Sequence, residues 1–422
     1  MENETPQTNA KKSRKSIALI AVLAVLFFVV VAYFAERSFD YFADGESYEK
    51  PLMGEIKRSF IAAGFAHSLA LSSEGKVFGA GFNRDGQLGL GDSGEETNRE
   101  TFALIASPQD KNIAAVAAGW VHSFALDENG AVYGSGWNKF GQLGLGDRDD
   151  RNSFTPVSSL GDNKIVAIAA GGAHSLALDI DGKVYAAGNN EFGQLGLGDK
   201  TNRKTFALIA LLKDKKIVAI AAGRAHSLAL TSDGKVYAAG NNERDQLGLG
   251  DKNNRDIFML VPDLNDKKIV AIAAGGDLSL ALDADGKVYA TGSNDFGQLG
   301  LGDDVNRSTF TPVSSLSDKK IVAITAGFVH ALALDAGGKV YAAGWNAYGQ
   351  LGLGDDADRQ IFTPVSSLEG KNIIAIVAGD VHSLALGKDG KLYATGSGEH
   401  GRLGLGGENN RDIFTPVVLP DQ

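Results

Sequence analysis

Histidine is the residue type in this chain whose spacing most suggests chemistry. One histidine follows each of six copies of the string A-G-x-x: His67, His122, His174, His226, His330 and His382. Two imidazoles that share a metal ion must each place a nitrogen about 2 Å from it. Copies one repeat apart cannot meet that requirement. We therefore expect no metal site, and a histidine that hydrogen-bonds the backbone of its own repeat. Leu278 replaces histidine in the remaining copy with little other change, which favours this structural role.

Acidic residues form two further patterns. Asp-x-Asp-Gly occurs at Asp179–Gly182 and Asp283–Gly286. The five ligand positions of a calcium-binding EF-hand loop, which end in glutamate, are absent, so we expect plain turns. Asp-x-x-x-Arg occurs as Asp147/Arg151, Asp199/Arg203, Asp251/Arg255, Asp303/Arg307 and Asp355/Arg359. We expect each arginine to bind the nearby carboxylate and loop carbonyls. The alternative is a basic ring for an anionic ligand.

No catalytic or cofactor-binding motif stands out in the sequence. The chain has no cysteine, which excludes disulfides, thiolate metal sites and cysteine nucleophiles. It also has no G-x-S-x-G, phosphate-loop or H-E-x-x-H string. The net charge of −10 argues against wrapping nucleic acid. We therefore expect a protein that is not an enzyme, holds no cofactor and binds no nucleic acid.

A repeat organises most of the chain. The glycine of A-G-x-x-H recurs at Gly64, Gly119, Gly171, Gly223, Gly275, Gly327 and Gly379, with a first step of 55 residues and five steps of 52. Each unit reads as four short strands, F-T-P-V, I-V-A-I-A-A-G, H-S-L-A-L and K-V-Y-A-A-G. Four-stranded units at this period predict an all-β, seven-bladed β-propeller.

Connection lengths suggest where one blade ends. About 18 residues separate K-V-Y-A-A-G from F-T-P-V, whereas the other connections are short. We take the long connection as the crossing between blades. The first unit then lacks its own F-T-P-V strand, and Phe414–Val417 is left over at the end. We therefore expect a propeller over residues 56–420 that is closed by this C-terminal strand.

The N-terminus predicts a membrane anchor. Residues 17–34 carry no charge, glycine or proline, and as a helix they would reach about 27 Å. Four basic residues between Lys11 and Lys15 precede them. We expect a cytoplasmic tail at 1–15, a transmembrane signal-anchor helix at 16–35 and a linker at 36–55. The propeller would then be extracytoplasmic, in the periplasm or outside the cell. A cleaved signal peptide is the alternative.

The string G-x-N-x-x-G-Q-L-G-L-G-D, together with A-G-x-x-H-S-L-A-L, resembles the repeats of the regulator of chromosome condensation family. In character the chain is most similar to exported bacterial members. The resemblance implies a seven-bladed propeller that binds through one loop face. Members include a nucleotide exchange factor for a small GTPase and a plant ultraviolet-B photoreceptor. The photoreceptor's tryptophan cluster is missing here, because only Trp120 occupies an A-G-W-x-H turn. We therefore do not expect light sensing.

Candidate binding residues lie where the near-identical repeats differ. After A-G, the variable position holds Phe65, Trp120, Arg224, Phe328 and Asp380, while beside G-x-N it includes Phe82, Trp137, Phe140, Trp345 and Tyr348. Successive strands are antiparallel, so both loops should emerge on one face. Aromatic residues and arginine are typical of binding hot spots. Neutral drift with local packing is the alternative.

These residues support three hypotheses about function. The first is a membrane-tethered module that binds a protein or peptide on this face. The second is binding of a glycan or cell-wall polymer by the same aromatic residues. The third is an enzyme that uses the central funnel, which the small apolar strands do not favour. A regulator similar to a guanine nucleotide exchange factor is a further alternative if the propeller is cytoplasmic.

Overall fold

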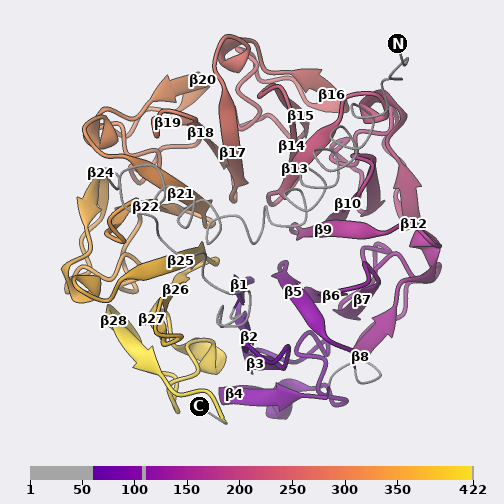
Figure 1. Cartoon of the computed structure of the whole chain (residues 1–422), viewed down its shortest axis with the longest axis horizontal. Helices are drawn as coiled ribbons and strands as arrows, with labels where there is room; N and C mark the ends of the chain where they lie inside the picture. The colour runs from indigo at the N-terminus through magenta and orange to yellow at the C-terminus, as the bar shows by residue number, and fades with distance from the viewer. Residues whose placement is uncertain (1–59, 107–110, 421–422) are drawn as a thin grey trace, which may run out of the picture.

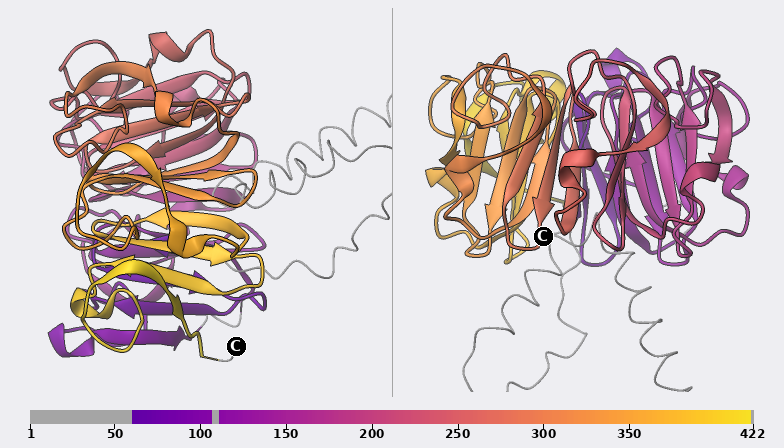
Figure 2. Two further views of the ribbon diagram at one scale, coloured as in Figure 1. Left: turned by 90° about the vertical axis from the view of Figure 1, so that its left-hand side faces the viewer. Right: turned by 90° about the horizontal axis from the view of Figure 1, so that it is seen from above.

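The computed structural model describes residues 60–106 and 111–420. These residues form seven four-stranded antiparallel sheets around a central axis (Figure 1). Seen from the side, the strands run from one face of the ring to the other (Figure 2). The predicted seven-bladed propeller of four-stranded blades is confirmed. Blade 1 contains β1–β4, and each later blade takes the next four strands, ending with β25–β28 in blade 7.

Each strand type occupies one radial position. The innermost strands are β1 (Phe60–Ala63), β5 (Ile113–Ala118), β9 (Ile165–Ala170), β13 (Ile217–Ala222), β17 (Ile269–Ala274), β21 (Ile321–Ala326) and β25 (Ile373–Ala378). The second are β2 (His67–Leu71), β6 (His122–Asp127), β10 (His174–Asp179), β14 (His226–Thr231), β18 (Leu278–Asp283), β22 (His330–Asp335) and β26 (His382–Gly387). The third are β3 (Val77–Gly81), β7 (Val132–Gly136), β11 (Val184–Gly188), β15 (Val236–Gly240), β19 (Val288–Gly292), β23 (Val340–Gly344) and β27 (Leu392–Gly396).

The outer strands all begin at the recurring arginine. They are β4 (Arg99–Ile105), β8 (Arg151–Pro156), β12 (Arg203–Leu208), β16 (Arg255–Leu260), β20 (Arg307–Pro312), β24 (Arg359–Pro364) and β28 (Arg411–Val417). Single 3-10 turns are η1 (Glu95–Thr97), η3 (Ser158–Leu160), η4 (Ala210–Leu212), η5 (Pro262–Leu264), η6 (Ser314–Leu316), η7 (Ser366–Leu368) and η8 (Glu399–Gly401). The turns η3 to η7 lie between the outer strand of one blade and the inner strand of the next.

The core lies between neighbouring blades. Leu176 and Leu178 of β10 are fully buried and pack with Ala229 and Phe258 of the next blade. Both faces of the second and third strands are covered in this way, so these strands are buried almost throughout. Gly196 shows how closely the blades approach. Its φ is +66°, and a Cβ there would come within 2.3 Å of the Phe258 ring.

The predicted blade boundary is wrong. β3 pairs with β4 across the long connection, and β28 pairs with β27. Each outer strand therefore belongs to the blade that precedes it in the chain. Phe414–Val417 lies in blade 7, so the C-terminal strand does not close the propeller by completing blade 1.

The long connection stays within one blade because it folds into a compact loop over its own sheet. In blade 3, the Asn190 side chain accepts a hydrogen bond from Leu195 N (2.9 Å) and donates one to Asp199 O (2.7 Å). The Asp199–Arg203 ion pair (2.5 Å) then starts the outer strand β12. Hydrogen bonds from side chains to the backbone fold this long loop back on itself, so its two ends lie close together in the same blade. The length of the connection therefore did not indicate where one blade ends and the next begins.

The two acidic patterns have the structural roles that we expected. The five Asp-x-x-x-Arg pairs are ion pairs of 2.5 to 2.6 Å. The Arg203 guanidinium also donates to the carbonyl of Thr201 at 2.6 Å. In the first Asp-x-Asp-Gly string, Asp179 Oδ1 accepts hydrogen bonds from the backbone of Asp181 and Lys183, both at 2.9 Å. The carboxylate thus organises a turn.

The histidines join neighbouring blades, so the predicted bond to their own repeat's backbone is wrong. His226 Nε2 lies 2.9 Å from Ser279 Oγ of the next blade, and five equivalent pairs measure 2.8 to 3.0 Å. Ser279 Oγ donates its proton to Gln246 O at 2.7 Å. Ser279 Oγ must therefore accept a hydrogen bond from His226, whose ring carries its hydrogen on Nε2. Burial lowers the pKa of His226 to about 3, so the ring stays neutral.

At one seam, the contact between two neighbouring blades, both partners of this hydrogen bond are replaced. Between blades 5 and 6, Leu278 replaces the histidine and Ala331 replaces the serine, and both are fully buried. The paired replacement leaves neither polar group without its partner. This indicates that histidine and serine work as a unit.

The predicted membrane helix at 16–35 lies outside the described residues and stays a prediction. In the part of the chain that the structure covers, no helix is long and apolar enough to span a bilayer.

Candidate functional site

A belt of backbone hydrogen bonds surrounds one mouth of the central channel. In every blade, the N–H of the residue after A-G donates to the A-G glycine carbonyl of the next blade, at 3.0 to 3.3 Å. The donors are Phe65, Trp120, Gly172, Arg224, Gly276, Phe328 and Asp380. Asp380 N bonds Gly64 O and so joins blade 7 to blade 1. This belt fixes the position of all five inner residues predicted from the sequence.

Four of those five side chains gather over the axis. The Trp120 ring lies 6.0 Å from Phe65 and 6.3 Å from Phe328, measured between ring centroids. The Arg224 guanidinium lies 5.5 Å from the Trp120 centroid and 5.7 Å from that of Phe328. Trp120 and Phe328 come from blades 2 and 6, so the cluster spans the channel mouth. Cation–π contacts of this kind stabilise a guanidinium on aromatic rings.

The predicted outer residues extend this cluster in two directions. Trp137 and Phe140 of blade 2 meet edge to face at 5.3 Å, and Trp345 and Tyr348 of blade 6 do the same at 5.3 Å. Trp137 N donates to Val121 O, next to Trp120, and Trp345 N donates to Val329 O, next to Phe328. Two aromatic pairs therefore flank the Trp120–Phe328 pair across this face, one in blade 2 and one in blade 6. We call these six residues the aromatic band: Phe140, Trp137, Trp120, Phe328, Trp345 and Tyr348. Phe82 lies apart from the band, against His400 at 4.8 Å.

Aromatic residues beside G-x-N leave a buried amide unpaired. In blade 3, Gln194 Nε2 donates to Asn189 Oδ1 at 2.9 Å. Where Phe82, Trp137 and Trp345 take the place of Asn189, the amides of Gln87, Gln142 and Gln350 have no partner among the described residues. A buried donor without an acceptor costs about 1–3 kcal/mol. The asparagine of blade 3 satisfies this amide, so the aromatic residues are not needed to build the loop, which favours a role in binding.

Blade 7 departs most from the repeat. Arg402 replaces the recurring glutamine and is only 2% exposed. Its guanidinium donates to Glu399 Oε2 (3.0 Å), Glu399 O (2.9 Å) and Phe65 O (3.3 Å). Because Phe65 belongs to blade 1, Arg402 contributes to closing the ring. Nearby, burial raises the pKa of Asp380 to about 6.

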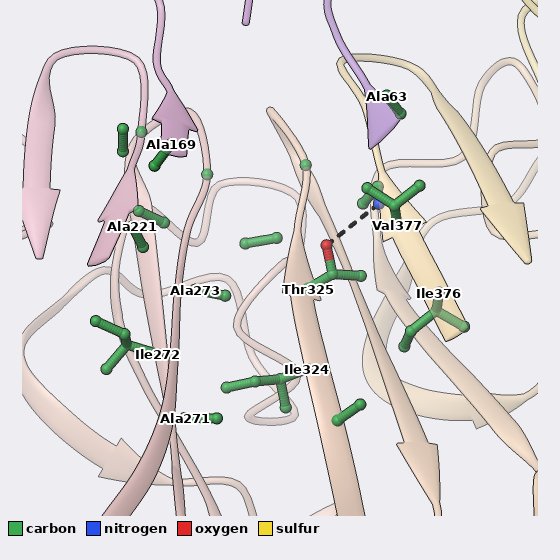
Figure 3. A pocket seen from close by; sticks show the side chains of 18 of the residues that line it. Ala63, Ala169, Ala221, Ala271, Ile272, Ala273, Ile324, Thr325, Ile376 and Val377 are labelled. Carbon is green, nitrogen blue, oxygen red and sulfur yellow. Dashed lines mark hydrogen bonds between the residues drawn. The ribbon is translucent and has the colours of Figure 1, made fainter. Parts of the chain in front are cut away.

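The channel behind the mouth has a volume of about 530 Å³. Alanine, valine and isoleucine of the inner strands line it, as Ala221, Ile324 and Val377 illustrate in Figure 3. The hydroxyl of Thr325 accepts a hydrogen bond from Ala378 N at 3.2 Å, drawn as a dashed line in Figure 3. Within the described ranges, no three His, Asp or Glu side chains converge as metal ligands would.

Sequence comparison between repeats missed some residues of this face. Phe296 lies 5.9 Å from Trp345 and occupies the repeat position of Phe140 and Tyr348. Asp277 lies 3.8 Å from Arg224. Arg402 differs from a glutamine present in the six other repeats. The replacement of glutamine by Arg402 could have been found by comparing the repeats, whereas the contact of Asp277 with Arg224 could not.

Known proteins share this architecture. The ultraviolet-B receptor UVR8 of Arabidopsis thaliana is 33% identical over 354 residues, which cover 84% of this chain and 80% of the receptor. Human WBSCR16 superposes with a TM-score of 0.74 at 25% identity, covering 82% of this chain and 94% of that one. Prp20p of Saccharomyces cerevisiae superposes with a TM-score of 0.68 at 26% identity, covering 77% of this chain and 81% of Prp20p. The structure of Prp20p was described together with its binding to Gsp1p and histones.

The family model for the RCC1-like domain matches residues 42–266 and, in a second overlapping match, residues 162–421. The two matches together span all seven blades. This chain is therefore a member of the RCC1-like domain family.

Proposed function

We propose that this protein is a membrane-tethered binding module without catalytic activity, whose aromatic band recognises a protein or peptide. The observation that carries the proposal is the band itself, which blades 2 and 6 form while leaving two buried glutamine amides unpaired. Partly exposed aromatic residues bring large apolar area to an interface at little cost in side-chain entropy. The binding of Gsp1p and histones by Prp20p favours a protein as ligand.

Location belongs to the same proposal. Residues 16–35 would anchor the chain, and the basic residues before them would hold the N-terminus in the cytoplasm. The propeller would then meet periplasmic or extracellular partners. If it instead faced the cytoplasm, its resemblance to the regulator of chromosome condensation family would favour a regulator similar to a guanine nucleotide exchange factor.

The test uses the full chain in its native membrane. A photo-crosslinking amino acid at Phe140 or Tyr348 should capture a protein, whereas the same group at Asp181, in a turn at the opposite ends of the strands, should not. Trp120→Gly, Trp137→Asn and Trp345→Asn together introduce the residues of sibling repeats. This variant should keep the fold, since Asn189 already plays that part in blade 3.

The triple variant should bind the captured protein at least about tenfold more weakly, since 1.4 kcal/mol gives that factor. Unchanged binding would refute the role of the aromatic band. Capture of a glycan, with no protein crosslinked, would support the carbohydrate alternative instead.

A further inference from the structure

Asp380 has a side chain that the fold does not need. Its backbone makes the same belt hydrogen bond as Gly172 and Gly276, which have no side chain at this position. A carboxylate here therefore adds nothing to the belt. Its contribution must come from contacts of the carboxylate itself.

That carboxylate is partly buried and incompletely paired. Asp380 Oδ1 is shielded from solvent and finds no hydrogen-bond donor among the described residues. The charges of two arginines, Arg402 and Arg224, act on Asp380. Arg402 directs its hydrogen bonds to Glu399 and to the Phe65 carbonyl, and Arg224 lies over the rings of Trp120 and Phe328. Holding a carboxylate out of water without a direct partner is unfavourable. A bound cation would remove this penalty.

Aromatic rings stand beside the same space. Asp380 lines the channel mouth together with Phe65, Trp120 and Phe328. The belt places it between Phe328, whose N–H bonds Gly379 O, and Gly64, which precedes Phe65. Arg224 already stacks on Trp120 and Phe328, which shows that these rings accommodate a guanidinium.

The charges favour a cation over an anion as ligand. Arg224 has a counter-ion in Asp277 at 3.8 Å. Asp380 Oδ1, by contrast, has no hydrogen-bond donor within the described part of the chain. The net charge of the chain, −10, also attracts a basic partner. Aromatic neighbours favour an organic cation over a metal ion.

We propose that the channel mouth is a subsite for a basic side chain of the partner, an arginine or lysine. Its cation would lie between the Asp380 carboxylate and the rings of Phe65, Trp120 and Phe328. This inference rests on the proposed function and specifies the chemistry of the ligand. It also gives the mouth a task distinct from that of the outer aromatic pairs.

The test uses the full chain in detergent, labelled with fluorotryptophan, and three short peptides. One peptide carries a central arginine, one carries citrulline, its neutral isostere, and one carries glutamate. The chain has three tryptophans, Trp120, Trp137 and Trp345, so each fluorine signal can be assigned by single replacement. The arginine peptide should shift the Trp120 signal in a saturable manner and leave the other two in place.

Four variants make the outcome decisive. Asp380→Asn should weaken the arginine peptide at least tenfold, to the level of citrulline, whereas the control Asp389→Asn in the opposite-face turn should not. Arg224→Ala should bind the arginine peptide at least as well as the parent, because it removes a competing cation. Equal binding of arginine and citrulline, or loss of binding in Arg224→Ala with a response to glutamate, would overturn the subsite. In Trp137→Asn/Trp345→Asn the arginine peptide should still bind, because neither residue lines the mouth. Equal binding of arginine and citrulline by a chain that still captures its protein partner would overturn the subsite and leave the proposed function standing.

Discussion

The hydrogen bond between His226 and Ser279 offers a direct test of how the blades are joined. Ser279→Ala leaves His226 Nε2–H buried without its acceptor, 2.9 Å from where the hydroxyl was. Both residues are fully buried, so we expect a loss of about 1–3 kcal/mol. His226→Leu removes the donor but leaves Ser279 bonded to Gln246 O, and should cost about 0.5–1.5 kcal/mol from the bond itself.

The double variant, His226→Leu with Ser279→Ala, recreates the Leu278–Ala331 seam that blades 5 and 6 already have. It should therefore cost less than the sum of the single variants, with a coupling energy of about 1 kcal/mol or more. Urea denaturation of the full chain in detergent, followed by tryptophan fluorescence, measures all four proteins.

The converse pair provides a matched control in the same molecule. Leu278→His alone buries a polar ring against Ala331, and Ala331→Ser alone buries a hydroxyl against Leu278. Together they should recover stability relative to either single variant. Strictly additive effects at both seams would refute the view that histidine and serine form one unit, and would leave the paired replacement unexplained.

Three further predictions concern the closure of the ring, Asp380 and the membrane topology. Arg402→Ala should lower the melting temperature by several degrees, because it removes a bond to blade 1 and the packing of a side chain that is only 2% exposed. Arg411→Ala, whose side chain bonds only neighbouring loop carbonyls, should change the melting temperature little, and equal melting of parent and Arg402→Ala would argue against a role in closure. Because burial raises the pKa of Asp380 to about 6, this carboxyl favours folding below its unfolded pKa and that contribution is lost as pH rises through 6. Asp380→Asn should thus raise the melting temperature at pH 8 and lose that advantage near pH 4, and a pH-independent difference would contradict the assignment. Protease added to intact spheroplasts, or to intact cells of a eukaryote, should digest the propeller, and full protection would exclude an extracytoplasmic location.

The repeat pattern was enough to predict the fold and the face on which the variable loops lie. A period of 52 residues, four β-rich strings in each repeat and turn signals between them leave a seven-bladed propeller as the architecture. Antiparallel order within a blade then places both variable loops at one end of the strands. These are properties of a single repeat, and the same pattern is present in every repeat of the chain.

Which repeats and residues meet could not be predicted from that pattern and became clear from the three-dimensional structure. Whether an outer strand such as β28 joins the blade before or after it depends on how the intervening loop folds, and the period is the same in either case. The partner of each buried histidine lies in the next blade, and the meeting of Trp120 with Phe328 brings together blades 2 and 6. Such contacts depend on the closed ring, which holds distant repeats at fixed positions. A local sequence pattern cannot contain that information.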